Sequence, residues 1–224
     1  MIVTWLGHSC FLLKGDDGLC ILLDPFMEDE VGYPLPIMET NMVIISHDHL
    51  DHNNVDAAGS CPDVIFGPGE YISKGIEIKG IKSYHDDRKG RLRGENTIFC
   101  FELDGVKVCH LGDLGHTLRP SQIHEIGPVD LLFIPVGGRY TIDAKSGNEV
   151  MRQLHPAVAV PMHYRTGALS FDLDPVDDFL IGKGNVTIQE TLQLTGETFI
   201  GGVVGDGQVA LLSCPVAEGR PADR

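Results

Sequence analysis

Residues 47–52 constrain what this chain can form more than any other segment does. They carry three histidines and two aspartates and come just after the apolar run 43–45. Nitrogen and carboxylate ligands crowded at the end of a strand are typical of a divalent-metal site. Histidines two positions apart on extended backbone point the same way, so His47 and His49 are expected to bind one ion. Asp51 and His52 follow as the chain turns. One tetrahedral ion cannot use all four groups and keep a position for water, so the run indicates two adjacent ions.

Length and composition are those of an ordinary globular chain. The 224 residues, 42% hydrophobic and 22% charged, suit one domain over residues 1–224, in which residues 217–224 are expected to fray. No apolar stretch approaches the ~20 residues that span a membrane, and the first residues lack a basic leader region, which favours a cytoplasmic protein. The six cysteines form no CxxC pair and are expected to be reduced. The formal net charge of −15 argues against nucleic acid as a partner.

Short apolar runs separated by turns predict a strand-rich first half and a mixed second half. Helices are expected from about 143 to 154, with Asp143 as the N-cap, and from Asp174-Pro175 to a point before Gly182. Asp104-Gly105 is a hairpin signal between two strands. Strands are expected over 2–6, 10–14, 19–23, 43–45, 63–66, 76–82, 97–103, 106–111, 130–134, 157–161, 186–194 and 208–215.

More metal ligands must come from other strand ends, and three residues fit. His85, Asp113 and His163 each follow an apolar run, where loops converge at the edge of a sheet. His110 is an alternative third histidine, but it lies only three residues before Asp113 in a predicted strand, and we interpret it as lying behind the ligands or in the core. The set that results places His47, His49 and His85 on one ion, Asp51, His52 and His163 on the other, and Asp113 between them.

With these residues in this order, the chain resembles the metallo-β-lactamase superfamily. More locally, the chain resembles the metal-dependent hydrolase branch of that superfamily, which is related to its lactonases and phosphodiesterases and is poorly defined in substrate. The resemblance runs from Ile2 to about Leu212. It implies an α/β fold, the four-layer αββα sandwich, with the site at the open edge between the sheets. The closer likeness is carried by the segments Leu6-Gly7-His8-Ser9, Leu23-Asp24-Pro25-Phe26, His110 to His116, Ile134 to Gly138 and Pro161-Met162-His163-Tyr164.

Other residues are candidates for supporting the ligands or contacting substrate. Asp24 follows an apolar run and is expected to accept the free N–H of a ligating histidine. His8 and Tyr164 are candidates for the pocket wall, with simple packing as an equal alternative. Gly137-Gly138 either offers backbone amides to a substrate oxyanion or forms a plain tight turn. In the basic stretch 88–93, Arg88 and Arg91 are candidates for attracting an anionic substrate, with a solvated loop as the alternative.

The predicted activity is hydrolysis of a small, anionic ester, lactone or phosphodiester by a metal-bound hydroxide. Asp51 and Asp113 are the expected catalytic carboxylates, and Asp51 is a candidate for handling the proton. The two divalent ions are expected to be Zn²⁺, with Mn²⁺ as an alternative for the carboxylate-containing second site. A nuclease and a non-catalytic metal-binding protein are the competing functions, and a homo-oligomer is an open alternative for assembly. A redox di-iron centre is disfavoured because His49 stands where a carboxylate is needed.

Overall fold

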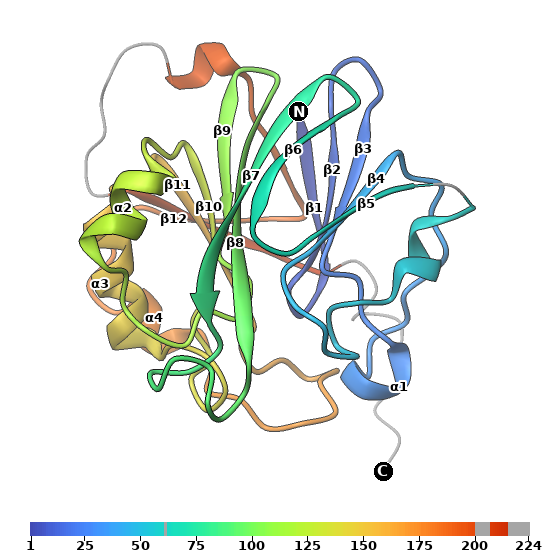
Figure 1. Cartoon of the computed structure of the whole chain (residues 1–224). Helices are drawn as coiled ribbons and strands as arrows, with labels where there is room; N and C mark the ends of the chain where they lie inside the picture. Colours follow the sequence, from blue (N-terminus) through green and yellow to red (C-terminus); the bar gives the residue numbers. More distant parts are fainter. Residues whose placement is uncertain (61, 200–206, 215–224) are drawn as a thin grey trace.

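Two β-sheets packed against each other form the centre of the protein. They are seen in the computed structural model, which describes residues 1–60, 62–199 and 207–214 (Figure 1). The six-stranded sheet has the order β13-β1-β2-β3-β4-β5, antiparallel from β13 to β3 and parallel from β3 to β5. Its strands are β1 (Ile2–Gly7), β2 (Cys10–Lys14), β3 (Cys20–Leu23), β4 (Met42–Ile45), β5 (Asp63–Phe66) and β13 (Thr191–Gln193).

The eight-stranded sheet has the order β12-β14-β11-β10-β9-β8-β7-β6. It is parallel from β12 to β9 and antiparallel from β9 to β6. β10 and β11 are apolar and buried at every residue, as expected for parallel strands covered on both faces. The strands are β6 (Gly69–Ser73), β7 (Ile76–Tyr84), β8 (Glu95–Leu103), β9 (Val106–His110), β10 (Leu131–Pro135), β11 (Val158–Met162), β12 (Val186–Gln189) and β14 (Gln208–Leu212).

Helices are few and short. α2 (Pro120–Ile126), α3 (Ala144–Leu154) and α4 (Asp177–Leu180) lie outside the eight-stranded sheet, while α1 (Glu28–Val31) and the 3₁₀ turn η1 (Val55–Ala58) accompany the other sheet (Figure 1). A second 3₁₀ turn, η2 (Gly196–Phe199), precedes β14. The Asp143 carboxylate accepts the Ser146 N–H at 2.8 Å, which confirms the predicted N-cap of α3. The expected α/β class with two sheets is confirmed. Within the described part of the chain, no helix is long and apolar enough to span a membrane.

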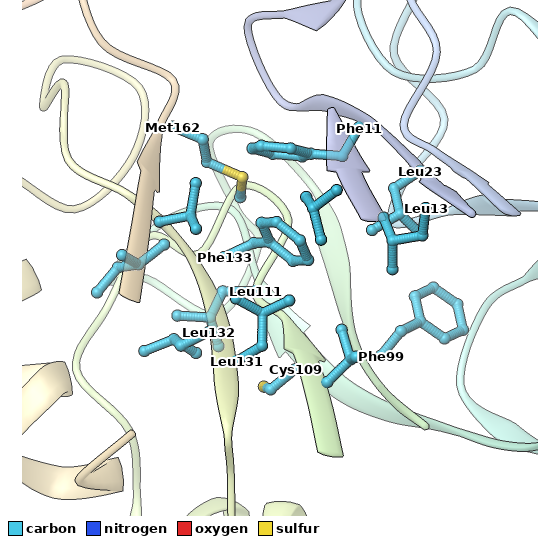
Figure 2. Close-up of a cluster of buried hydrophobic side chains, with 14 of the residues drawn as sticks. Phe11, Leu13, Leu23, Phe99, Cys109, Leu111, Leu131, Leu132, Phe133 and Met162 are labelled. Atoms are coloured by element: carbon cyan, nitrogen blue, oxygen red, sulfur yellow. The ribbon is translucent and has the colours of Figure 1, made fainter. Parts of the chain in front are cut away.

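The hydrophobic core fills the space between the two sheets. Phe11 of β2 and Phe133 of β10 meet there with ring centroids 4.2 Å apart, and Figure 2 places Phe133 near the centre of the cluster. Both side chains are fully buried. The same two rings also contact His110 at the end of β9, with centroids 6.5 and 5.9 Å away. The core therefore extends directly to a polar residue at the edge of the sheets.

Several predicted boundaries differ from those observed. The single strand predicted over 186–194 is two strands: β12 joins one sheet and β13 the other, with Glu190 between them. Apolar periodicity gives no information on which sheet a strand joins, so this crossover was missed. The helix predicted from Asp174 is shorter, because α4 begins only at Asp177, and the Asp174 carboxylate lies 3.8 Å from Arg139 instead of capping it. β6 and α2 were not predicted. The predicted fraying of 217–224 concerns residues outside the described ranges.

The carboxyl ends of several strands meet at one edge, which lies at the bottom of Figure 1 where β7 ends. This convergence follows from the topology, because parallel neighbours end on the same side of a sheet. Each predicted metal ligand lies in a loop that leaves this edge. The loops follow β4, β7, β9 and β11.

Candidate metal centre

Three histidines form the first group of donor atoms. His47 and His49 approach to 3.0 Å between Nε2 and Nδ1, and His85 joins them with all three donor atoms within 4.8 Å of one another. The segment carrying His47 and His49 bends directly after β4 rather than continuing as a strand. The extended-backbone argument for their pairing is therefore wrong, although the rings do meet. Of the three, only His49 is exposed.

The second group consists of Asp51, His52, His163 and His8, whose donor atoms also lie within 4.8 Å of one another. His52 and His163 are buried, and Asp51 is half-buried. The distance from His52 Nε2 to Asp51 Oδ2 is 3.6 Å. The sequence places the first three of these residues in one site, and His8 is the addition made by the tertiary structure.

Asp113 lies between the two groups. Its Oδ2 is 3.1 Å from Nε2 of His85 and 3.1 Å from Nε2 of His163, and its Oδ1 is 3.3 Å from His52 Nε2. Two atoms bound to one tetrahedral zinc at about 2.1 Å lie about 3.4 Å apart, so these spacings suit shared metal ions. His52 Nε2 and Asp113 Oδ1 are buried without a hydrogen-bond partner among the described residues. Such orphaned polar atoms are costly unless a cation occupies the site, so the donor set fits metal ions.

Charge complementarity holds the cluster together. Burial disfavours the Asp113 anion, but His163 and the other neighbouring histidines hold its pKa well below the ordinary value. Burial likewise disfavours charged His52, yet Asp113, Asp51 and Asp24 raise its pKa well above the ordinary value. The three carboxylates thus favour the protonated imidazole of His52, and binding of a metal ion at Nε2 would compete with that proton.

Asp24 lies behind the ligands and accepts hydrogen bonds from one of them, His52, and from Ser46 and His110. Its Oδ1 accepts the Ser46 N–H at 2.7 Å, and its Oδ2 accepts the Ser46 hydroxyl at 2.7 Å. The same Oδ2 lies 3.0 Å from His52 Nδ1 and 2.8 Å from His110 Nε2. Because Nδ1 of His52 is held by Asp24, its Nε2 points to the cluster. His110 is buried beneath the site, 2.8 Å from Asp24 and outside the three donor groups.

Two more histidines are held in the same way. His47 Nδ1 lies 2.9 Å from the Ser46 hydroxyl oxygen, which itself donates to Asp24. His85 Nδ1 donates to the Tyr140 carbonyl at 3.1 Å. In each case the bond occupies Nδ1 and leaves Nε2 as the donor atom facing the cluster.

Asn96 is a supporting residue that sequence reasoning missed. Its side-chain oxygen accepts the Asp113 N–H at 3.0 Å, and its amide donates to Leu111 O and to Ser83 Oγ. Gly112 makes this approach possible, because a Cβ there would lie 2.4 Å from Asn96 Oδ1, and its φ of +53° is left-handed. The only sequence signal is a polar residue at the start of an apolar strand.

The remaining candidates occupy distinct places. Tyr164 stacks on Trp5, with centroids 5.3 Å apart, and packs rather than lining the cavity at the cluster. The Gly138 amide donates to the Ile142 carbonyl at 3.2 Å and is not free for a substrate oxyanion. Gly137 permits close packing, since a Cβ there would lie 2.1 Å from the His163 carbonyl oxygen. The glycine pair thus forms a tight turn that supports the His163 loop.

A cavity of about 440 Å³ opens over the cluster. Its floor includes His49, Asp51, His85, Asp113 and His163, and its rim consists of Glu30, Leu92, Arg93, Tyr140 and Phe171. The Arg93 guanidinium lies 5.5 Å from the Tyr140 ring centroid and has no carboxylate within ion-pair distance among the described residues. The basic loop therefore reaches the site through Arg93 rather than through the predicted Arg88 and Arg91. Arg88 is exposed, 3.9 Å from Asp87, and Arg91 is exposed outside the lining.

The buried carboxylate of Asp86 shapes this loop. It accepts backbone N–H groups from Arg88 and Gly90 at one oxygen and from Leu92 and Arg93 at the other, at 2.7 to 2.9 Å. Burial opposes the anion, but these four hydrogen bonds lower the pKa of Asp86 to about 2. The position of the rim thus depends on one ionised side chain.

Known proteins resemble this chain in sequence and in fold. A model of the beta-lactamase superfamily domain matches residues 2–163, which contain every predicted ligand. The chain is 30% identical over 200 residues to a metal-dependent hydrolase of Thermoplasma acidophilum, covering 78% of this chain and 86% of that protein. A Thermotoga maritima structure described as a Zn-dependent hydrolase of the metallo-beta-lactamase superfamily is 38% identical with a TM-score of 0.73, over 94% of this chain and 97% of that one. A metallo hydrolase of Ignicoccus hospitalis, 22% identical with a TM-score of 0.62 and 94% of each chain covered, shares the fold.

Asp24→Asn should lower metal affinity by roughly 10- to 100-fold without unfolding the protein, because neutral Asn no longer fixes the His52 and Ser46 donors. Competition with a chromogenic chelator measures the change. Asp48→Asn is the matched control: Asp48 lies inside the histidine run, but it is exposed and its carboxylate contacts only Asn53 among the described residues. Equal affinities for the two variants would contradict the role given to Asp24.

Asp86→Asn should remove roughly 1–3 kcal/mol of folding free energy near neutral pH, because Asn offers one acceptor oxygen to four N–H groups. An unfolded aspartate has a pKa of about 3.9, above the folded value of about 2. The stabilisation by Asp86 is therefore present above about pH 4 and is lost as the pH falls toward 2. Urea unfolding of the metal-free protein from pH 6 to 2 should show a smaller loss for Asp86→Asn than for wild type. The exposed neighbour provides the control, and Asp87→Asn should follow wild type.

Proposed function

Since the chain belongs to the metallo-β-lactamase superfamily and is a metal-dependent hydrolase, we propose that it cleaves a small anionic ester, lactone or phosphodiester at a dinuclear metal centre. One observation carries the dinuclear part of the proposal. A single Asp113 oxygen lies 3.1 Å from two histidines that belong to different donor groups. A carboxylate in that position suits a bridge between two ions.

Different side chains would have different roles in such a reaction. Bound divalent ions would supply a water of lowered pKa and a Lewis acid that polarises the substrate oxygen. Asp51 lies on the cavity wall, where burial opposes its charge but His52 and His8 hold its pKa below the usual range. Its ionised carboxylate is therefore placed to accept a proton from the attacking water. His47, His52 and His85 keep their Nε2 atoms directed at the cluster, since their Nδ1 atoms are held by Ser46, Asp24 and the Tyr140 carbonyl.

Zinc is the metal we propose for the first site, which consists of three imidazoles. The Thermotoga maritima relative is described as Zn-dependent, which supports the same choice here. Manganese remains the alternative for the second site, which contains a carboxylate. A cytoplasmic location belongs to the proposal too, because Cys10, Cys20, Cys100 and Cys109 are free thiols.

The rim of the cavity supports the substrate class. Arg93 offers a cation without a carboxylate partner among the described residues, while Leu92 and Phe171 offer apolar surface beside it. A small anion with an apolar group would match both features. Nucleic acid is disfavoured as the substrate by the net charge of −15, which repels a phosphate backbone. A non-catalytic metal-binding role leaves the open cavity above the cluster without an explanation.

Metal analysis joined to a substrate panel tests the proposal. Wild-type protein should hold two divalent ions per chain, and removal of both with a chelator should abolish hydrolysis that added Zn²⁺ or Mn²⁺ restores. His47→Ala should lose one ion and reduce turnover by at least 100-fold with the fold intact by circular dichroism. His124→Ala, an exposed histidine on α2, should change neither quantity. Unchanged turnover of His47→Ala would contradict the assigned site, and failure of a fully loaded protein on every ester, lactone and phosphodiester would favour the non-catalytic role.

Arg93→Ala should raise KM for bis(p-nitrophenyl) phosphate about tenfold, because the charge that attracts the anion is lost at a partly desolvated rim. For the neutral ester p-nitrophenyl acetate, KM should change less than twofold. Arg88→Ala serves as the matched control, since Arg88 belongs to the same loop but lies 3.9 Å from Asp87 at the surface. An equal rise in KM for charged and neutral substrates would show that Arg93 acts on loop structure instead of on the anion.

A further inference from the structure

We propose that His8 is a fourth side-chain ligand of the ion held by Asp51, His52 and His163. His8 follows β1 in the turn to β2, more than thirty residues before the histidine run. Its ring centroid lies 4.3 Å from that of His163 and 5.2 Å from that of His52. The inference rests on the proposed dinuclear centre, and it concerns a residue outside the seven predicted ligands.

The spacing of donor atoms supports direct binding. His8 Nε2 lies 3.3 Å from Asp51 Oδ2, which is close to the separation of about 3.4 Å between two atoms on one tetrahedral zinc. The same separation occurs between His52 Nε2 and Asp113 Oδ1, at 3.3 Å. The donor atoms of all four residues of the second group lie within 4.8 Å of one another. His8 therefore occupies the same place relative to its neighbours as the predicted ligands do.

Burial separates His8 from the substrate. Only 1% of its surface is exposed, and it is absent from the residues that line the cavity, which include Asp51 and His163. Phe171 stands edge-on to the His8 ring at 5.5 Å and itself lines the cavity. His8 thus faces the donor group from behind, where a substrate does not reach. This position disfavours the predicted role in the pocket wall and favours one toward the ion.

The backbone at His8 is built to hold the ring in this place. Its φ of +52° lies in the left-handed region, which is uncommon for a residue with a bulky side chain. The carbonyl oxygen of His8 accepts the Trp5 indole N–H at 3.0 Å and the His163 backbone N–H at 3.2 Å. Two hydrogen bonds therefore hold the strained turn at His8 in place, and one of them ties it to the backbone of His163, another residue of the same group. Strain of this kind persists where the surrounding structure requires it, most often at functional sites.

Metal preference is a consequence of the extra imidazole. Together with Asp113, the second site then has three imidazoles and two carboxylates directed at one ion. This number exceeds the four ligands of a tetrahedral zinc site. Ions that accept five or six ligands from nitrogen and oxygen, such as Mn²⁺, suit such a site better. The two sites are thus expected to differ in metal preference.

His8 acting only as a hydrogen-bond donor to Asp51 is the competing explanation, and His8→Gln separates the two. Gln keeps an N–H that can donate to Asp51 but is a poor ligand for transition metals. Metal-free wild type, His8→Gln and the control His116→Gln are titrated with Co²⁺ while the visible absorption is recorded. His116 lies outside the three donor groups, and its Nδ1 contacts the Thr117 carbonyl.

Loss of a ligand should weaken the second equivalent of Co²⁺ at least tenfold in His8→Gln and change the intensity of its absorption band, with the first equivalent unaffected. His116→Gln should match wild type. Wild-type affinity and spectrum in His8→Gln would overturn the proposal for His8. A wild type that binds one Co²⁺ in total would instead overturn the dinuclear centre, so the two failures are distinguishable.

A measurement on wild type covers the case in which His8→Gln fails to fold. Each histidine bound to Co²⁺ gives one paramagnetically shifted, exchangeable ring N–H signal in the proton NMR spectrum. The proposal expects six such signals, one each from His8, His47, His49, His52, His85 and His163. Absence of the signal from His8, with those of the equally buried His52 and His163 present, would overturn it.

Discussion

A single buried carboxylate, Asp24, connects the parts of this structure that the site needs. Asp24 follows β3, and its partners Ser46 and His110 follow or end strands of the two different sheets. A carboxylate with no exposed surface is costly unless every lone pair is satisfied, so these donors must stand where they are. The aromatic core reaches the same point, because Phe11 and Phe133 contact the His110 ring. The packing between the two sheets and the positions of the metal ligands therefore depend on the same contacts.

Backbone conformation at the strand ends adds a second constraint. Asp24, His8 and His163 have φ values of +41°, +52° and +51°, in the left-handed region that non-glycine residues seldom adopt. Each costs of order 1 kcal/mol or more, and each turns the chain so that a polar side chain points to the cluster. Gly112 reaches a similar φ without a side chain, which lets Asp113 approach Asn96. Conformations that a strand cannot adopt thus direct the ligands toward one another.

The candidate metal ligands and the rim of the cavity lie in different parts of the site. The donor atoms lie in loops that follow buried strands, whereas the rim of the cavity is formed by other loop residues, Leu92, Arg93, Tyr140 and Phe171. Loops on a fixed scaffold commonly carry specificity, because their residues can change without disturbing the core. Asp86 limits that freedom in one loop by holding four backbone amides. Under the proposed function, the residues that hold the metal ions carry out hydrolysis, and the rim residues select the substrate.

Much of this arrangement was predictable from the sequence, since apolar periodicity and turn residues are local signals. The strands that precede each ligand, the hairpin at Asp104-Gly105 and the cap of α3 were all expected, and β8, β9 and α3 have the predicted character. The short spacing of the histidine run, from His47 to His52, indicates a metal site without knowledge of the fold. These inferences succeed because each depends on residues a few positions apart.

The sequence by itself determined which residue types form the candidate metal site, which strands precede those residues, and the two-sheet class. Tertiary structure alone decided that His8 joins the second group, that Asn96 holds Asp113 and that Arg93 rather than Arg88 reaches the cavity. It also decided that residues 186–194 divide between two sheets. The physical reason is the same in each case. These contacts join residues far apart in the chain through left-handed turns and loop hydrogen bonds, whose directions have no local signature.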